Sequence, residues 1–109
     1  MANQKAEYHH PEDVQDRLHA LGFSHLRARK HGSAVIVESG PTADPLKHFR
    51  LRRDTVHLWV LDIANHRGGW ERTPYRQQIM ELVQLVVDQF PWTIQDVFMN
   101  PEGTSEPGN

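Results

Sequence analysis

The stretch KHFRLRRDTVHLWVLDI, residues 47–63, decides the fold. It holds two runs of alternating side chains with Asp54-Thr55 between them. Successive residues of a strand point to opposite faces of a sheet, and short polar residues between two such runs are typical of a tight turn. The stretch therefore predicts a β-hairpin with strands at 47–53 and 56–63, of which the second is the more apolar.

Two more strands are expected upstream of this hairpin. Residues 25–30 (HLRARK) alternate, and residues 34–39 (AVIVES) alternate and are rich in β-branched side chains. The residues HGS at 31–33 fit a turn between these strands. The segment SGPTADP at 39–45 is dense in turn-forming residues, so we expect it to be a loop.

A chain reversal and a short last strand are expected downstream of the hairpin. Residues 65–69 (NHRGG) tolerate positive φ, which suits a turn. The next three residues, WER at 70–72, are expected to form the strand.

The first helix is expected at residues 11–21. Pro11 fits the first helical position, because its missing N–H costs nothing there. Gly22 fits the position just after the helix, where positive φ allows Phe23 to contact Leu18 in a Schellman ending.

The second helix is the strongest periodic signal in the chain. Its apolar residues recur at spacings of three and four up to Phe90. Thr73 is expected to be the N-cap and Pro74 the first helical residue. Phe90 precedes Pro91, which disfavours a further helical turn.

These elements predict an α+β fold, a two-layer sandwich in the order α-β-β-β(-β)-α, with three to five antiparallel strands between the helices. Its antiparallel sheet is expected to carry both helices on one face. Residues 9–99 are expected to form one domain, with a flexible N-terminal tail at 1–8 and a disordered C-terminal tail at 100–109.

Composition sets the class of protein that we expect. The 109 residues include no cysteine, so disulfides and thiolate chemistry are excluded. No apolar run approaches the ~18 residues that a membrane span needs, and the N-terminus has no hydrophobic signal segment. We therefore expect a cytoplasmic protein with no membrane partner.

Charge is unevenly distributed along the chain. The net charge is −2, but residues 25–72 hold nine Lys/Arg against five Asp/Glu, while the remaining residues are strongly acidic. Such a division is a reason to consider an anionic partner.

The sheet face opposite the helices is the candidate binding surface, because an antiparallel sheet often leaves one face open. Strict alternation along the strands predicts which residues lie on or near this face. The candidate binding residues are Arg27, Arg29, His48, Arg50, Arg52, His57 and Trp59.

Recognition of a protein partner or of a second copy, as a homodimer, is the first reading of this face. Leu61 and Ile63 share the face of Trp59 and need cover from another chain or from the segment around Trp92 and Phe98. Trp and Arg are also frequent in interface hot spots.

Nucleic-acid binding, to RNA or single-stranded DNA, is the alternative, because arginines pair with phosphates and aromatic rings stack on bases. A third reading is a small metal-independent ribonuclease that uses His57 or His48 with Arg50. We expect a non-enzymatic binding module, because the chain lacks a nucleophile motif.

A second candidate is an anion site at the glycine pair, beside the N-terminus of the second helix. Its residues are Arg67, Gly68, Gly69 and Arg72. A plain turn followed by an N-cap explains the same residues. We expect no cofactor and no metal, because the histidines follow no metal-ligand spacing.

Overall fold

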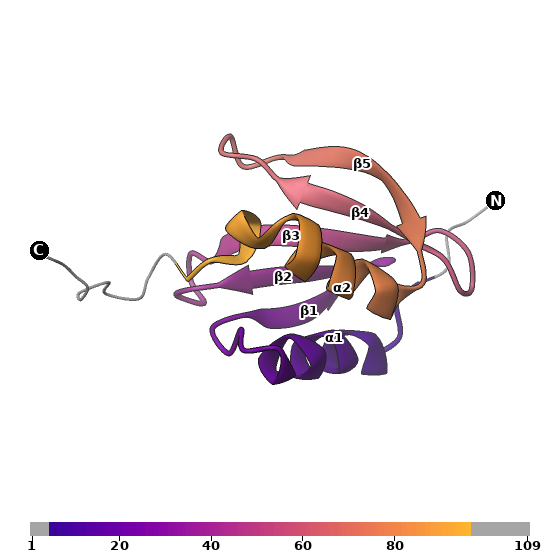
Figure 1. The fold of residues 1–109 in the computed structure, drawn as a ribbon, viewed down its shortest axis with the longest axis horizontal. Coiled ribbons are helices and arrows are strands. Elements are labelled where there is room, and N and C mark those ends of the chain that lie inside the picture. The colour runs from indigo at the N-terminus through magenta and orange to yellow at the C-terminus, as the bar shows by residue number, and fades with distance from the viewer. Residues whose placement is uncertain (1–4, 97–109) are drawn as a thin grey trace, which may run out of the picture.

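The computed structural model describes residues 5–96 of the chain. A helix comes first, five strands follow, and a helix and a short 3₁₀ helix complete the order (Figure 1). The elements are α1 (His9–Ala20), β1 (Arg27–His31), β2 (Ala34–Ser39), β3 (Leu46–Arg53), β4 (Trp59–Ala64), β5 (Trp70–Gln77), α2 (Ile79–Gln89) and η1 (Pro91–Ile94).

The strands form one antiparallel sheet in the order β1-β2-β3-β4-β5, so each strand pairs with the next along the chain. Both helices lie on the same face of the sheet, in front of it in Figure 1. The α+β two-layer sandwich is therefore confirmed. None of the helices within residues 5–96 is long and apolar enough to cross a membrane.

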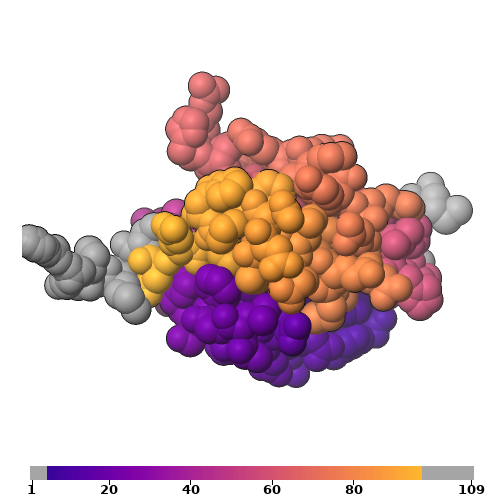
Figure 2. Space-filling model, in the orientation of Figure 1, coloured from indigo at the N-terminus to yellow at the C-terminus, as the bar shows by residue number. Residues whose placement is uncertain are grey.

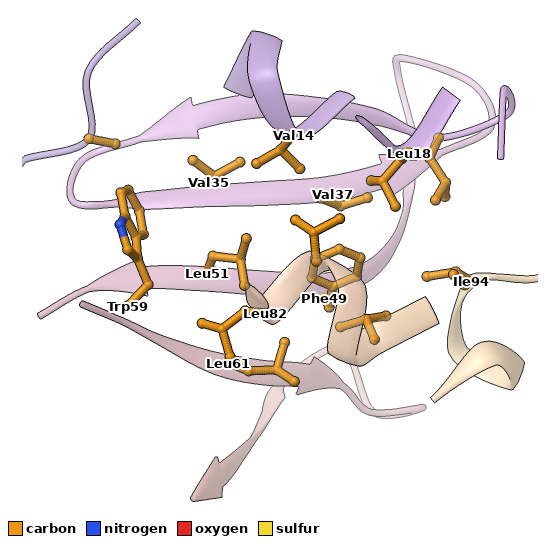
Figure 3. Packing of buried hydrophobic residues seen from close by; sticks show 14 residues of the cluster. Val14, Leu18, Val35, Val37, Phe49, Leu51, Trp59, Leu61, Leu82 and Ile94 are labelled. Atoms are coloured by element: carbon orange, nitrogen blue, oxygen red, sulfur yellow. The ribbon is translucent and has the colours of Figure 1, made fainter. Parts of the chain in front are cut away.

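The hydrophobic core fills the space between the sheet and the two helices. Figure 3 shows side chains of β2, β3 and β4 meeting those of α1 and α2 in one layer. Burial of this apolar surface is the main favourable term in folding. The large side chains with almost no exposure are Trp59, Phe49, Leu18, Leu26, Leu51, Leu61, Leu82, Ile94, Val14, Val35, Val37 and Val83.

Trp59 belongs to this core, where it is 1% exposed, and its expected place on the open face is wrong. A two-residue turn would set Trp59 opposite Arg50. The connection instead occupies residues 54–58, and Trp59 lies opposite Arg53. Because this register differs by an odd number of residues from the expected one, the two faces of β4 are exchanged.

Leu61 and Ile63 follow Trp59 onto the helix-covered face. Leu61 is fully buried in the core, and Ile63 packs against it. The helices of the same chain supply the cover that these residues need. The segment around Trp92 and Phe98 was the other expected source of this cover, and Phe98 lies outside the described residues.

The second helix begins later than expected, because Thr73 and Pro74 lie in β5. The Thr73 hydroxyl donates to the Leu61 carbonyl at 2.8 Å and does not cap a helix. β5 is an edge strand with a register irregularity, where proline is tolerated. α2 starts after Gln78, whose N–H donates to the Glu81 carboxylate at 3.1 Å.

The end of α1 matches the expectation. Gly22 has a φ of +102°, and its N–H donates to His19 O at 3.0 Å. The N–H of Phe23 donates to Leu18 O at 2.9 Å. Together these bonds form the Schellman motif, which satisfies carbonyls at the helix end.

The segment before α1 is docked onto the sheet. Ala6 is 3% exposed, and its N–H donates to Gly32 O at 3.1 Å. Arg53 donates to Lys5 O at 2.8 Å. The packed part of the chain therefore begins before His9. Residues 1–4 and 97–109 lie outside the described residues; they include half of the expected N-terminal tail and all of the expected C-terminal tail.

Trp59→Ala is expected to lower the free energy of unfolding by about 3–5 kcal/mol, because it leaves a cavity in the core. Trp92→Ala is the matched control, because Trp92 is 64% exposed; its effect should stay within about 0.5 kcal/mol. Urea unfolding followed by circular dichroism measures both variants. Equal, small effects would contradict the place of Trp59 in the core.

Candidate functional site

The open face of the sheet, opposite the helices, is lined by a cross-strand row that reaches all five strands. Arg29, Ile36, Arg50, Asp62 and Arg72 are successive partners in the register. Directly opposed residues of antiparallel strands share a face. A second row of the same face consists of His31, Ala34, Arg52, Val60 and Arg76.

Asp62 is the buried centre of this face, with no exposed surface. Its Oδ2 accepts from Arg50 Nε at 2.9 Å and from Arg52 Nε. Its Oδ1 accepts from Arg52 Nη2 at 3.1 Å, so Arg52 binds in the bidentate manner. Two cations thus share one carboxylate, and we call these three residues the Asp62 cluster.

The hydrogen bond to Asp62 and the charge of that carboxylate raise the pKa of Arg52 above its ordinary value. Arginine is already protonated at any pH at which proteins fold. The Asp62 cluster therefore carries a net positive charge throughout that range.

Glu38 repeats this arrangement on β2. It is 5% exposed, and its Oε2 accepts from Arg29 Nε at 3.1 Å and lies 3.9 Å from Arg27 Nε. Unlike the Asp62 cluster, this Glu38 cluster is incompletely paired. Glu38 Oε1 and Arg27 Nη2 are both buried without a hydrogen-bond partner.

Arg50 also covers an aromatic ring. Its guanidinium carbon lies 4.7 Å from the ring centroid of Trp70, within the range of a cation–π contact. Arg29 and Arg50 flank Ile36, which is 4% exposed although no helix covers this face. Arginine stems can shield apolar residues in this way while the guanidinium groups stay accessible.

The margin of the open face adds further cations. Arg72 lies opposite Asp62, and Lys47 lies opposite Glu38. Arg76 pairs with Asp54 of the loop between β3 and β4. The arginines and Lys47 of the face therefore outnumber its carboxylates.

His48 does not lie on the open face, and this expectation is wrong. A β-bulge between Val37 and Glu38 makes His48 the extra residue of β3, which breaks the alternation. His48 Nδ1 donates to Thr93 O at 2.6 Å, so its Nε2 accepts from the Ser39 hydroxyl, also at 2.6 Å. His48 is thus a buried residue whose hydrogen bond to Thr93 O connects β3 to η1.

His57 does not lie in a strand. It belongs to the loop at residues 54–58 and lines a cavity with His10, Arg53 and Trp59, on the helix side of the sheet. The structure therefore does not bring His57 or His48 beside Arg50, as the ribonuclease reading requires.

The glycine pair forms a closed turn. Asn65 Oδ1 accepts from the N–H groups of Arg67 and Gly69, both at 2.9 Å, and Asn65 O accepts from Gly68 N at 3.3 Å. These amides are used inside the turn, and α2 begins only at Ile79. The structure therefore does not assemble the expected anion site, and Arg72 belongs to the open face.

Metal ligands are not clustered in the part of the chain that the structure describes. Within residues 5–96, no group of three or more His, Asp or Glu side chains is placed to hold a metal ion. Comparisons with protein-family models, with curated proteins and with solved structures find no match for this chain.

The sequence reasoning missed Trp70, Asp62 and Glu38 as residues of the site. Trp70 was expected in a short strand, but its face depends on the register of β4. Glu38 follows Val37 and Asp62 follows Leu61. Because successive strand residues point to opposite faces, this alternation with core residues could have placed both carboxylates on the open face. A carboxylate that shares a strand face with arginines of the neighbouring strands is such a signal.

Acid is expected to destabilise the protein. Burial lowers the pKa of His48 and of His10 from the ordinary 6.5. His25 further lowers the pKa of His48, while Thr93 and Asp96 oppose this effect. Below about pH 6.5 the unfolded chain binds more protons than the native one, so stability is lost as pH falls.

The melting temperature should therefore fall between pH 7.5 and 5.5, and His48→Gln should flatten this dependence. His66→Gln is the control, because His66 is exposed in the β4–β5 turn. Thermal unfolding at both pH values measures the effect. A melting temperature that rises on acidification would contradict it.

Asp62→Ala is expected to cost about 1–3 kcal/mol of stability, because it removes charged hydrogen bonds to Arg50 and Arg52. Asp54→Ala is the control. Asp54 also pairs with an arginine, but both side chains are more than a third exposed, so the loss should be below about 1 kcal/mol. Urea unfolding compares the two. An equal loss in both would show that burial of Asp62 has no energetic role.

Proposed function

We propose that this chain is a non-enzymatic binding module whose open face binds single-stranded nucleic acid. The observation that carries the proposal is the pairing of arginines on buried carboxylates, next to Trp70. This arrangement supplies fixed guanidinium groups for phosphates and an aromatic ring beside them.

The Asp62 cluster keeps donors for a ligand. Arg50 uses Nε and Nη2 toward Asp62, and Arg52 uses the same two nitrogens. The Nη1 groups of both arginines have no partner among residues 5–96. Since the carboxylate holds both side chains in place, less rotamer freedom is lost when a phosphate accepts from them.

The charge distribution favours the sheet as the place of contact. The exposed residues of α1 include Glu12, Asp13 and Asp16, and those of α2 include Glu81 and Asp88. A polyanion is repelled from this acidic layer and attracted to the arginines on the other side of the sheet. A chain with a net charge of −2 can therefore bind an anion on one face.

Recognition of a protein or of a second copy is the second candidate. The apolar residues that favoured it on the sheet lie in the core, so another surface must carry it. Trp92 is 64% exposed and meets Phe90 edge to face. An exposed aromatic side chain of this kind is suited to a protein contact.

Arg72→Glu is the sharpest test of the nucleic-acid proposal. Arg72 is exposed, and its side chain makes no hydrogen bond or ion pair within residues 5–96, so its replacement breaks no internal side-chain pair. The affinity for a labelled single-stranded RNA should fall, and the log–log salt slope should decrease by about one, because phosphate contacts release counterions. Fluorescence anisotropy over a salt series measures both.

Arg17→Glu is the matched control, because it makes the same charge change on the exposed surface of α1. It should leave affinity nearly unchanged. Equal losses of affinity in both variants would show that only the net charge of the protein matters, and would contradict the assignment of binding to the open face.

Light scattering without RNA tests the second candidate, recognition of a second copy. A dimer that is dissociated by Trp92→Ala would support this candidate.

A further inference from the structure

A cavity of about 280 Å³ lies at the end of the sheet where β3 and β4 separate. The first β3–β4 partners are Phe49 and Ile63, so the strands are unpaired beyond them. In Figure 2 the tip of the β4–β5 hairpin projects from the body of the molecule. We call the cavity between the separating strands the sheet-end cavity. Its lining residues are Pro45, Leu46, Lys47, Ala64, Asn65, His66, Gly68 and Gly69.

This cavity adjoins the open face. Ala64 in its wall is the cross-strand partner of Trp70, and Trp70 carries Arg50 above its ring. Lys47, another lining residue, lies opposite Glu38 on the same face. A nucleic-acid strand that is bound by the arginines of the open face therefore reaches the cavity without leaving the sheet surface.

The lining combines apolar walls with polar groups. Pro45, Leu46 and Ala64 supply the apolar surface, and Lys47 supplies a positive charge. Asn65 uses its Oδ1 within the turn, while its Nδ2 has no partner among residues 5–96. Apolar walls beside a free amide donor, an imidazole and a cation suit a heterocycle that is linked to a phosphate.

We infer that the sheet-end cavity takes one unpaired nucleobase of the strand bound to the open face. This inference rests on the proposed function. The volume of the sheet-end cavity is just below the range of about 300–1,000 Å³ that is typical of drug-sized ligands. A cavity of this size fits one ring system and not a longer segment. A base in this cavity has to leave its stack, so a duplex is excluded from the same contact.

Binding to an oligouridylate and to an abasic sugar–phosphate oligomer of equal length tests the inference. Both ligands carry the phosphates, but only the first carries bases. The native protein should bind the oligouridylate about tenfold more tightly, as one buried base contributes. Ala64→Leu fills the cavity and should reduce this difference to what stacking on Trp70 alone supplies, while leaving the affinity for the abasic oligomer unchanged.

Leu46→Ser is a second variant, because Leu46 is 39% exposed and its loss should not prevent folding. It removes an apolar wall and should also reduce the preference for bases.

Two controls make similar changes elsewhere. Ala20→Leu adds the same side chain on the exposed end of α1, and Val56→Ser removes an exposed aliphatic residue from the loop at 54–58. Both should keep the tenfold preference.

The outcomes separate this inference from the proposed function. If the native protein binds neither oligomer, the proposed function fails and the inference fails with it. If it binds both equally, the phosphate contacts stand and the base subsite is overturned. If Ala64→Leu or Leu46→Ser weakens both oligomers by the same factor, the cavity has no role in base recognition and the inference is also overturned.

Discussion

Phe49, Leu51 and Arg53 of β3 lie opposite Ile63, Leu61 and Trp59 of β4, and this register determines both faces of the sheet. On the helix side it places Trp59 in the core, where its ring meets the ring of His10 edge to face. On the other side it sets Asp62 opposite Arg50. A shift by one residue would expose the core residues and bury the arginines.

The carboxylates of the open face are the other unusual feature of this architecture. Asp62 has no exposed surface and Glu38 has 5%, and burial of an unpaired charge is strongly unfavourable. Each is tolerated because two arginines compensate it from neighbouring positions. The Glu38 cluster remains incompletely bonded, since Glu38 Oε1 and Arg27 Nη2 lack partners.

The two layers of the fold also separate the charges of the chain. Acidic side chains cover the outer surface of the helices, and arginines cover the far side of the sheet. Because five antiparallel strands can be covered on only one face by two helices, the other face is available to a partner. The base subsite that we infer at the end of the sheet extends this surface and does not require a separate domain.

Much of the fold was predictable from the sequence, because it depends on contacts between neighbouring residues. β2 at Ala34–Ser39 and the Schellman end of α1 occur as the local pattern indicates. The placement of the arginines on β1 and β3 also followed from alternation. The late start of α2 did not follow from the sequence. Thr73 and Pro74 are good helix-start residues, but the residues on both sides of them pair with β4 and hold them in β5.

The sequence by itself therefore determined the α+β class, the single sheet with helices on one face, and the arginine-rich character of the other face. Only the tertiary structure decided which face Trp59 occupies, where His48 points, and that Trp70 and Asp62 join the site. The physical reason is that these features depend on loop length, a bulge and cross-strand register. Burial across the whole domain selects among these possibilities, and no short segment records that choice.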